Sequence, residues 1–152
     1  MKILVAFDTK YGNTETVAKT IVEGIKSVEG IEVTLSNMKK VDFKKLDGYD
    51  AILVGCPTHF GGPTRGAKKF IDKLGKLDLK GKRIATFDTY IKEDFEKSVK
   101  NMEERINEKT PGLQLLLPGL SIQVGDMKGP ILEEEFPKCR EFGKRVATQL
   151  KS

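Results

Sequence analysis

The sequence predicts an α/β fold: a three-layer, open parallel sheet of five strands with helices on both faces. Three observations predict it. Apolar segments of strand length alternate with amphipathic segments of helix length along the whole chain. The 152 residues suit one hydrophobic core and are too few for two. No repeat and no linker divides the sequence, so residues 1–152 are expected to form a single domain.

Five apolar segments have the length and composition of strands. The first, residues 2–8, and the third, 51–56, are almost entirely apolar, which is typical of central parallel strands covered on both faces. The fifth is interrupted by Pro118 and Gly119. The complete set of expected strands is 2–8, 31–38, 51–56, 83–88 and 114–117, with the fifth resuming at 120–124.

Helical spacing of apolar residues predicts the helices between these strands. In residues 13–28, Val17, Ile21 and Ile25 lie on one stripe, and Gly30 ends the helix. Residues 39–50 are expected to form a short or irregular helix. The other expected helices are 64–74, 93–108 with Phe95 in its buried stripe, and a last helix that carries Phe136, Cys139, Gly143, Val146 and Leu150.

The loop after the first strand is the strongest functional signal. Ligands of open parallel sheets bind beyond the carboxyl ends of the strands. Here Thr9, Asn13 and Thr14 offer side-chain donors at the start of a helix, where free amide N–H groups and the helix dipole attract an anion. Gly12 permits a close approach of the backbone. We expect a phosphate site; the alternative is an ordinary turn in which Thr9 or Asn13 caps the helix.

Several other chemistries lack the residues that they require. The chain contains neither a GxxxxGK[ST] loop nor a GxGxxG pattern, so nucleoside triphosphate hydrolysis and ordinary dinucleotide binding are not indicated. A phosphatase centred on Cys56 would need an arginine where Gly62 stands. No cluster has metal-ligand spacing, and no nucleophile–base pair is visible. Cys56 is more typical of a buried thiol at the end of a strand.

Two further loops reach the same edge of the sheet. The loop at 57–64 contains His59, the only histidine, beside Phe60 and the pair Gly61 and Gly62; this suits a mobile wall over a flat ligand. An exposed loop histidine is the alternative. After the fourth strand, Tyr90 has the position to stack on a planar ring, or to pack on the following helix. Residues 128–131 are also expected to border this edge.

Composition limits the partners and the compartment. The formal charge is +5, carried by scattered lysines, which favours acidic partners. No basic stripe interleaved with aromatic residues indicates nucleic acid, and no apolar run is long enough to span a membrane. The chain opens on a strand pattern rather than a signal peptide. Cys56 and Cys139 form no CxxC pair, so a reducing cytoplasm is expected.

Together these loops resemble those of flavodoxins. The resemblance is sharpest in the phosphate-loop pattern from Thr9 to Glu15 and in Gly55-x-Pro57-Thr58-His59, which is similar to the flavin loop in the flavodoxin modules of flavo-diiron proteins. It implies a sheet of order 2-1-3-4-5 and bound FMN. It further implies a phosphate site of Thr9, Lys10, Tyr11, Gly12, Asn13 and Thr14, and two ring walls, one of Pro57, Thr58, His59, Phe60 and Gly61, the other of Phe87, Asp88, Thr89 and Tyr90.

The activity implied by this resemblance is low-potential, one-electron transfer between redox proteins, without catalysis of a bond rearrangement. An NAD(P)H-dependent flavin or quinone reductase is a second hypothesis, although the chain has little length for a nicotinamide site. A regulatory protein that binds FMN weakly is a third. The chain also departs from the pattern: Tyr11 replaces a small hydroxyl residue, no tryptophan is present, and the charge is basic where flavodoxins are typically acidic.

Overall fold

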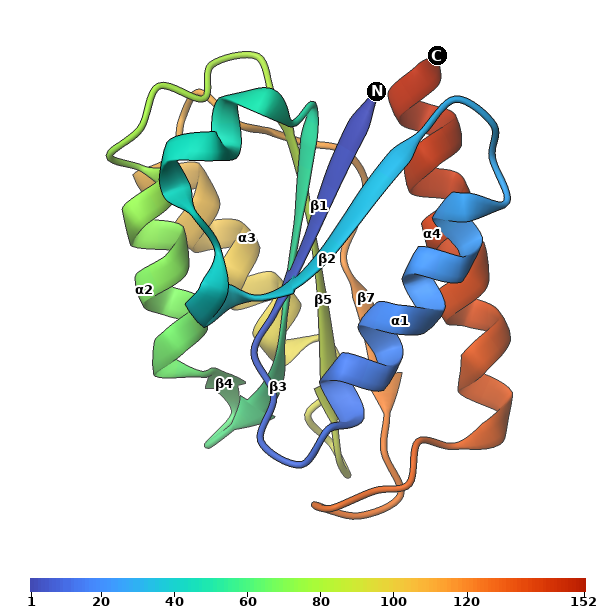
Figure 1. Cartoon of the computed structure of the whole chain (residues 1–152). Helices are drawn as coiled ribbons and strands as arrows, with labels where there is room; N and C mark the ends of the chain where they lie inside the picture. Colours follow the sequence, from blue (N-terminus) through green and yellow to red (C-terminus); the bar gives the residue numbers. More distant parts are fainter.

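The computed structural model describes residues 1–152, and its sheet has the expected topology (Figure 1). The parallel order is β2-β1-β3-β5, and β5 then pairs with β6 at one end and with β7 at the other, so the fifth expected strand is formed in two pieces. The order 2-1-3-4-5 is therefore confirmed. The strands are β1 (Lys2–Phe7), β2 (Glu32–Asn37), β3 (Ala51–His59), β4 (Gly62–Pro63), β5 (Arg83–Tyr90), β6 (Gln114–Leu115) and β7 (Leu120–Gln123).

Four helices cover the two faces of this sheet (Figure 1). One core lies between the sheet and α1 with α4, and a second lies between the sheet and α2 with α3. In place of one short or irregular helix at 39–50, the chain forms two short 3₁₀ helices between Met38 and Gly48. The helices are α1 (Asn13–Lys26), α2 (Arg65–Leu74), α3 (Lys97–Lys109) and α4 (Phe136–Lys151), and the 3₁₀ helices are η1 (Met38–Lys40), η2 (Phe43–Gly48) and η3 (Glu133–Glu135).

The expected helix 93–108 begins four residues late, at Lys97. Lys92 and Glu96 adopt left-handed backbone angles, with φ of 57° and 63°, and a helix cannot continue through such residues. Phe95 therefore lies before the helix and is 55% exposed, so its expected place in the buried stripe is wrong. Its ring instead packs edge-on against Tyr90, with 5.5 Å between ring centroids.

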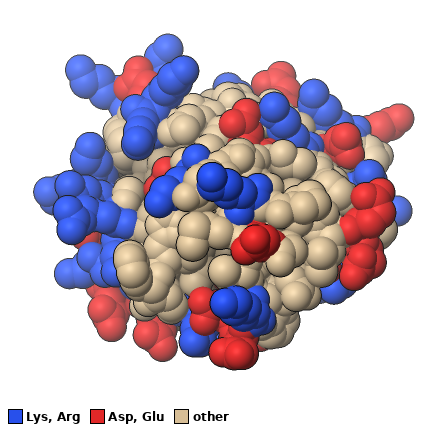
Figure 2. All heavy atoms as spheres, turned by 90° about the horizontal axis from the view of Figure 1, so that it is seen from below, with Lys and Arg blue, Asp and Glu red and all other residues tan.

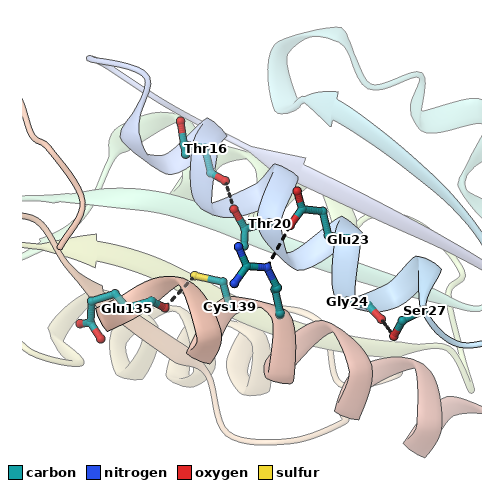
Figure 3. A network of polar contacts seen from close by, with 8 residues as sticks. Thr16, Thr20, Glu23, Gly24, Ser27, Glu135 and Cys139 are labelled. Carbon is teal, nitrogen blue, oxygen red and sulfur yellow. Dashed lines mark hydrogen bonds and ion pairs between the residues drawn. The ribbon is translucent and has the colours of Figure 1, made fainter. Parts of the chain in front are cut away.

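Helices α1 and α4 pack closely because glycine lies at both contact points. A Cβ on Gly24 would lie 2.0 Å from the carbonyl oxygen of Arg140, and a Cβ on Gly143 would lie 2.0 Å from that of Ile21. Figure 3 shows this interface, where the Arg140 guanidinium donates to Glu23 at 3.2 Å. This tight contact fixes α1 against the sheet, and so fixes the position of its amino end.

Candidate functional site

A cavity of about 290 Å³ opens at the carboxyl edge of the parallel strands. It lies where the loops after β1, β3, β5 and β7 meet, which is the edge at which the sequence predicts a ligand. Six of its fifteen lining residues are hydrophobic, so it combines apolar walls with polar groups. The cavity is lined by Thr9, Lys10, Tyr11, Asn13, Thr14, Pro57, Thr58, His59, Phe60, Thr89, Tyr90, Ile91, Asp94, Val124 and Met127.

The amino end of α1 faces this cavity without a side-chain cap. Gly12, at φ of 92°, directs its own N–H to the Thr9 hydroxyl oxygen at 3.0 Å. The first intrahelical bond runs from the Thr16 N–H to the Gly12 carbonyl, so the N–H groups of residues 13, 14 and 15 have no acceptor. Three free amides at the positive end of a helix dipole form an anion site.

Two hydroxyl side chains meet at the floor of this anion site. Thr14 is buried, and its hydroxyl oxygen lies 3.0 Å from that of Thr89, which reaches the cavity from β5. This contact brings the first and third predicted loops together. Because either hydroxyl can donate, the pair keeps one further hydrogen free to turn toward a ligand.

The second predicted loop is a tight β-hairpin. Strand β3 continues beyond the expected end to His59 and pairs antiparallel with β4, so that His59 lies opposite Gly62. Phe60 and Gly61 form the turn with φ of 52° and 75°, the angles of a type I′ turn. An aromatic residue is strained in this conformation. The Phe60 side chain is completely exposed at the rim of the cavity.

His59 lines the cavity as an uncharged group at neutral pH. Burial of its ring and the nearby Lys10 charge lower its pKa below the usual value, with burial the larger cause. Beside it, the Thr58 and Ser98 hydroxyl oxygens lie 2.8 Å apart and hold the hairpin to α3. The wall on this side of the cavity is therefore apolar and neutral at His59 and Phe60.

The third predicted loop divides between the cavity and the core. Thr89 and Tyr90 line the cavity, whereas Phe87 and Asp88 do not. Phe87 is completely buried, and a Cβ on Gly55 would lie 2.0 Å from its ring. Thr89 and Tyr90 are the last two residues of β5 and reach the edge of the sheet, whereas Phe87 and Asp88 lie deeper in it. Of the expected residues 87–90, only Thr89 and Tyr90 therefore line the cavity.

Asp88 closes the amino end of α3 from inside the fold. It is fully buried, accepts the Ser121 hydroxyl at 2.6 Å, and accepts the Val99 N–H at 3.0 Å. The Ser121 oxygen in turn accepts the N–H of Glu96 at 2.9 Å. Burial raises the pKa of Asp88 to about 7, although these hydrogen bonds favour its charged form.

Four lining residues were not predicted: Ile91, Asp94, Val124 and Met127. The two from the segment after β5 reach the cavity because the left-handed Lys92 turns the chain back. Met127 comes from the loop after β7, where its sulfur accepts the Tyr11 hydroxyl at 3.7 Å. The expectation that residues 128–131 border the site gave a partial signal, since Gly129 lies directly against the Asn13 side chain.

Comparison with known proteins decides the family. The family model described as flavodoxin matches residues 5–135. The chain belongs to the flavodoxin family. A flavodoxin from Clostridium saccharobutylicum is 40% identical over 89 residues, which are 59% of this chain and 56% of that relative.

Solved flavodoxin structures share the complete fold. A flavodoxin from the domain Archaea matches with a TM-score of 0.85 and 25% identity over 100% of both chains. Oxidised Flavodoxin 2 from Bacillus cereus matches with a TM-score of 0.81 and 33% identity over 97% of this chain and 99% of that one. A flavodiiron protein from Giardia intestinalis shares the fold at 18% identity over 36% of its chain, with a TM-score of 0.76.

The cavity fits the cofactor of this family, which is FMN. Free amides at α1 suit a phosphate, and the slot between the Phe60 hairpin and Tyr90 suits a flat aromatic ring. By contrast, no group of His, Cys, Asp and Glu residues could hold a metal ion. Burial raises the pKa of Cys56 to about 12, so this thiol is no nucleophile at neutral pH. No helix is long and apolar enough to cross a membrane.

Proposed function

We propose that this chain is a low-potential FMN-binding electron carrier that exchanges single electrons with redox partner proteins. The observation that carries the proposal is the uncapped amino end of α1, which opens into the cavity of a flavodoxin-family chain. At α2 and α3 a side chain accepts one N–H of the first turn, from Ala67 and from Val99, whereas no side chain does so at α1.

The residues divide into two binding tasks in this proposal. Thr9, Gly12, Asn13 and Thr14 hold the phosphate, with backbone N–H groups of Lys10 and Tyr11 beside them. The ring lies between the hairpin side, formed by Pro57, Thr58, His59, Phe60 and Gly61, and the opposite side, formed by Thr89 and Tyr90. Phe87 and Asp88 support this second side from behind.

Bound FMN supplies the capacity to take up and release electrons one at a time. The residues around the ring determine how readily FMN takes up and releases each electron. His59 carries no charge at neutral pH and the Asp94 carboxylate is paired with Lys97 at 2.9 Å, so apolar and uncharged walls around the ring disfavour negative charge on reduced FMN. Gly61 and Gly62 carry no Cβ, which lowers the cost of a change of peptide orientation in the hairpin beside the ring.

Partners and location follow from charge and from the thiols. The net charge of +5 favours acidic redox partners. Both cysteines are free and buried, in accord with a reducing, cytoplasmic location. Neither the reductase hypothesis nor the weak-binding hypothesis has an observation of its own in its favour.

A reductive titration of the FMN-loaded protein tests the proposal. We expect a tight yellow complex that is reduced in two resolved one-electron steps, whereas free FMN, the control, is reduced without a resolved first step. Reduction by NADH or NADPH alone would contradict the proposal in favour of a reductase. Failure to retain FMN on gel filtration would contradict it in favour of the weak-binding hypothesis.

A further inference from the structure

Basic residues are scattered along the whole chain, but the excess of positive over negative charge lies in one segment. Residues 65–83 contain eight lysines and arginines and only two aspartates, while the other 133 residues carry 19 basic and 20 acidic side chains. The entire net charge therefore comes from α2 and the connection that follows it. Figure 2 looks onto the cavity end of the molecule, and Lys and Arg side chains gather on its left, the side on which α2 lies in Figure 1.

The charges on α2 oppose the stability of their own helix. We call Arg65, Lys68, Lys69, Lys73 and Lys76 the α2 ridge. Arg65, Lys69 and Lys73 follow one another at intervals of four residues, so like charges are neighbours on one face. Arg65 and Lys68 also lie near the positive end of the helix dipole; the first turn of α2 holds no acidic residue, and the nearby Asp8 carboxylate is bonded to the Thr64 hydroxyl at 2.6 Å. A helix selected for stability alone would not carry this pattern.

No ion pair within the molecule explains the ridge. Its five basic groups form none, and the only acidic residue of α2, Asp72, is held by two bonds of 2.8 Å from Arg105 of α3. Lys73 does lie over the Phe43 ring, 5.3 Å from its centroid, but the other four have no such contact. The ridge is thus an array of cations available to an external anionic surface.

The ridge is continuous with the rim of the cavity. Thr64 caps α2 directly after the hairpin, so Arg65 lies five residues from the exposed Phe60. Apolar side chains are exposed at this rim: Tyr11, Phe60 and Met127 line the cavity, and Phe95 packs against the lining Tyr90. An apolar rim with a cationic flank matches the composition of a protein docking surface, with an apolar centre and a charged margin that orients the partner.

We propose that the α2 ridge is the docking surface for an acidic face of the redox partner protein, which it guides onto the Phe60 side of the cavity. This inference rests on the electron-carrier function proposed above. A second copy of this chain that docked through its own ridge would be repelled by the same charges. Nucleic acid fits less well, because the ridge presents no exposed aromatic side chain among its cations.

The test compares two triple variants with equal loss of charge. Lys68→Gln, Lys69→Gln and Lys73→Gln remove the middle of the ridge; Lys26→Gln, Lys144→Gln and Arg145→Gln remove the same charge from α1 and α4. The probe is an acidic [2Fe–2S] ferredoxin, reduced beforehand, from which one electron passes to the FMN-loaded protein. Its second-order rate constant is measured by stopped flow at low and high salt.

At about 20 mM salt we expect the ridge variant to react at least about tenfold more slowly than the unmodified protein, and the control variant less than about twofold more slowly. At about 0.5 M salt the three proteins should converge. The ridge variant should also unfold at a slightly higher temperature, since like-charge neighbours are removed. Equal slowing of both variants, or no slowing of the ridge variant, would overturn the proposal.

Two measurements separate this proposal from the one on which it rests. Calorimetric titration of the same ferredoxin into the apo-protein measures docking without FMN, and ridge-dependent binding is expected there too. If FMN is not retained, the carrier function fails while docking is still decided by this titration. A single-stranded DNA oligonucleotide that binds the ridge more tightly than the ferredoxin does would overturn the docking proposal in favour of nucleic acid.

Discussion

All four helices begin at the same edge of the sheet (Figure 1), but their first turns differ. Helix α4 continues from η3, so the Phe136 N–H is already bonded to the Glu133 carbonyl and Pro137 has no N–H. The Thr64 side chain caps α2 by accepting the Ala67 N–H at 3.2 Å, and the buried Asp88 accepts the Val99 N–H of α3 at 3.0 Å. At α1 no side chain takes this role, and the position before the helix is Gly12. The difference shows that the chain satisfies its helix ends where they support the fold and leaves free the one end that faces the cavity.

Placing a negative charge at the uncapped amino end of α1 should have the largest effect, and this effect should be on FMN affinity. Asn13→Asp places a carboxylate in the first turn of α1, where it stabilises the apo-protein by about 0.3–1 kcal/mol through the helix dipole. The same carboxylate replaces a donor and repels a phosphate, so FMN affinity should fall at least about 100-fold. Fluorescence titrations with FMN and with riboflavin, together with urea unfolding of the apo-protein, measure these opposite changes.

The control for this substitution is Asn13→Ala, which removes the donor without adding charge. It should weaken FMN binding by a smaller factor, about tenfold, and leave riboflavin binding within about twofold. If Asn13→Asp weakened FMN and riboflavin equally, the assignment of the phosphate to α1 would be wrong.

The buried Asp88 at the amino end of α3 should make the stability of the protein depend on pH. The pKa of Asp88, about 7, lies above the value of an unfolded aspartate, so the folded protein holds a proton that the unfolded chain has already lost. Stability therefore falls as pH rises between these two values. Relative to Asp88→Asn, the unmodified protein should lose about 2 kcal/mol of unfolding free energy from about pH 5.5 to about pH 7.5. Urea unfolding at both pH values measures this; parallel curves would exclude the raised pKa.

Loss of the Thr64 cap at α2 should have the smallest effect, and it should change only the stability of the protein. Thr64→Ala removes the acceptor for the Ala67 N–H and the 2.6 Å bond to Asp8, and should cost about 1 kcal/mol. Because Thr64 does not line the cavity, FMN affinity should stay within about twofold. The exposed Thr148→Ala in α4 is a matched control that should change neither quantity. A large loss of FMN affinity in Thr64→Ala would contradict the claim that the α2 cap affects stability alone.

The open end could be predicted from sequence because it is local. Strand, glycine and helix start follow one another within residues 2–14, so Gly12, Asn13 and Thr14 indicate the anion site directly. The parallel α/β class came from the alternation of strands and helices along the chain, whereas the order of the strands came from the family resemblance.

The third loop could not be predicted in the same way. β5 is buried on both faces, so its sequence does not show which residues face the cavity; Phe87 is directed inward by Gly55 on a neighbouring strand. Asp94 reaches the cavity only because Lys92 and Glu96, residues without a glycine signal, adopt left-handed angles. These features depend on packing between distant segments, which composition and periodicity do not encode.

Amide chemical shifts test the difference between the helix ends most directly. In ¹H–¹⁵N spectra, addition of FMN should move the amide proton signals of Asn13, Thr14 and Glu15 strongly downfield, while riboflavin should leave them nearly unchanged. The signals of Ala67 and Val99, whose amides are already bonded, should respond to neither ligand. Identical shifts of residues 13–15 with both ligands would contradict a phosphate held by the amino end of α1.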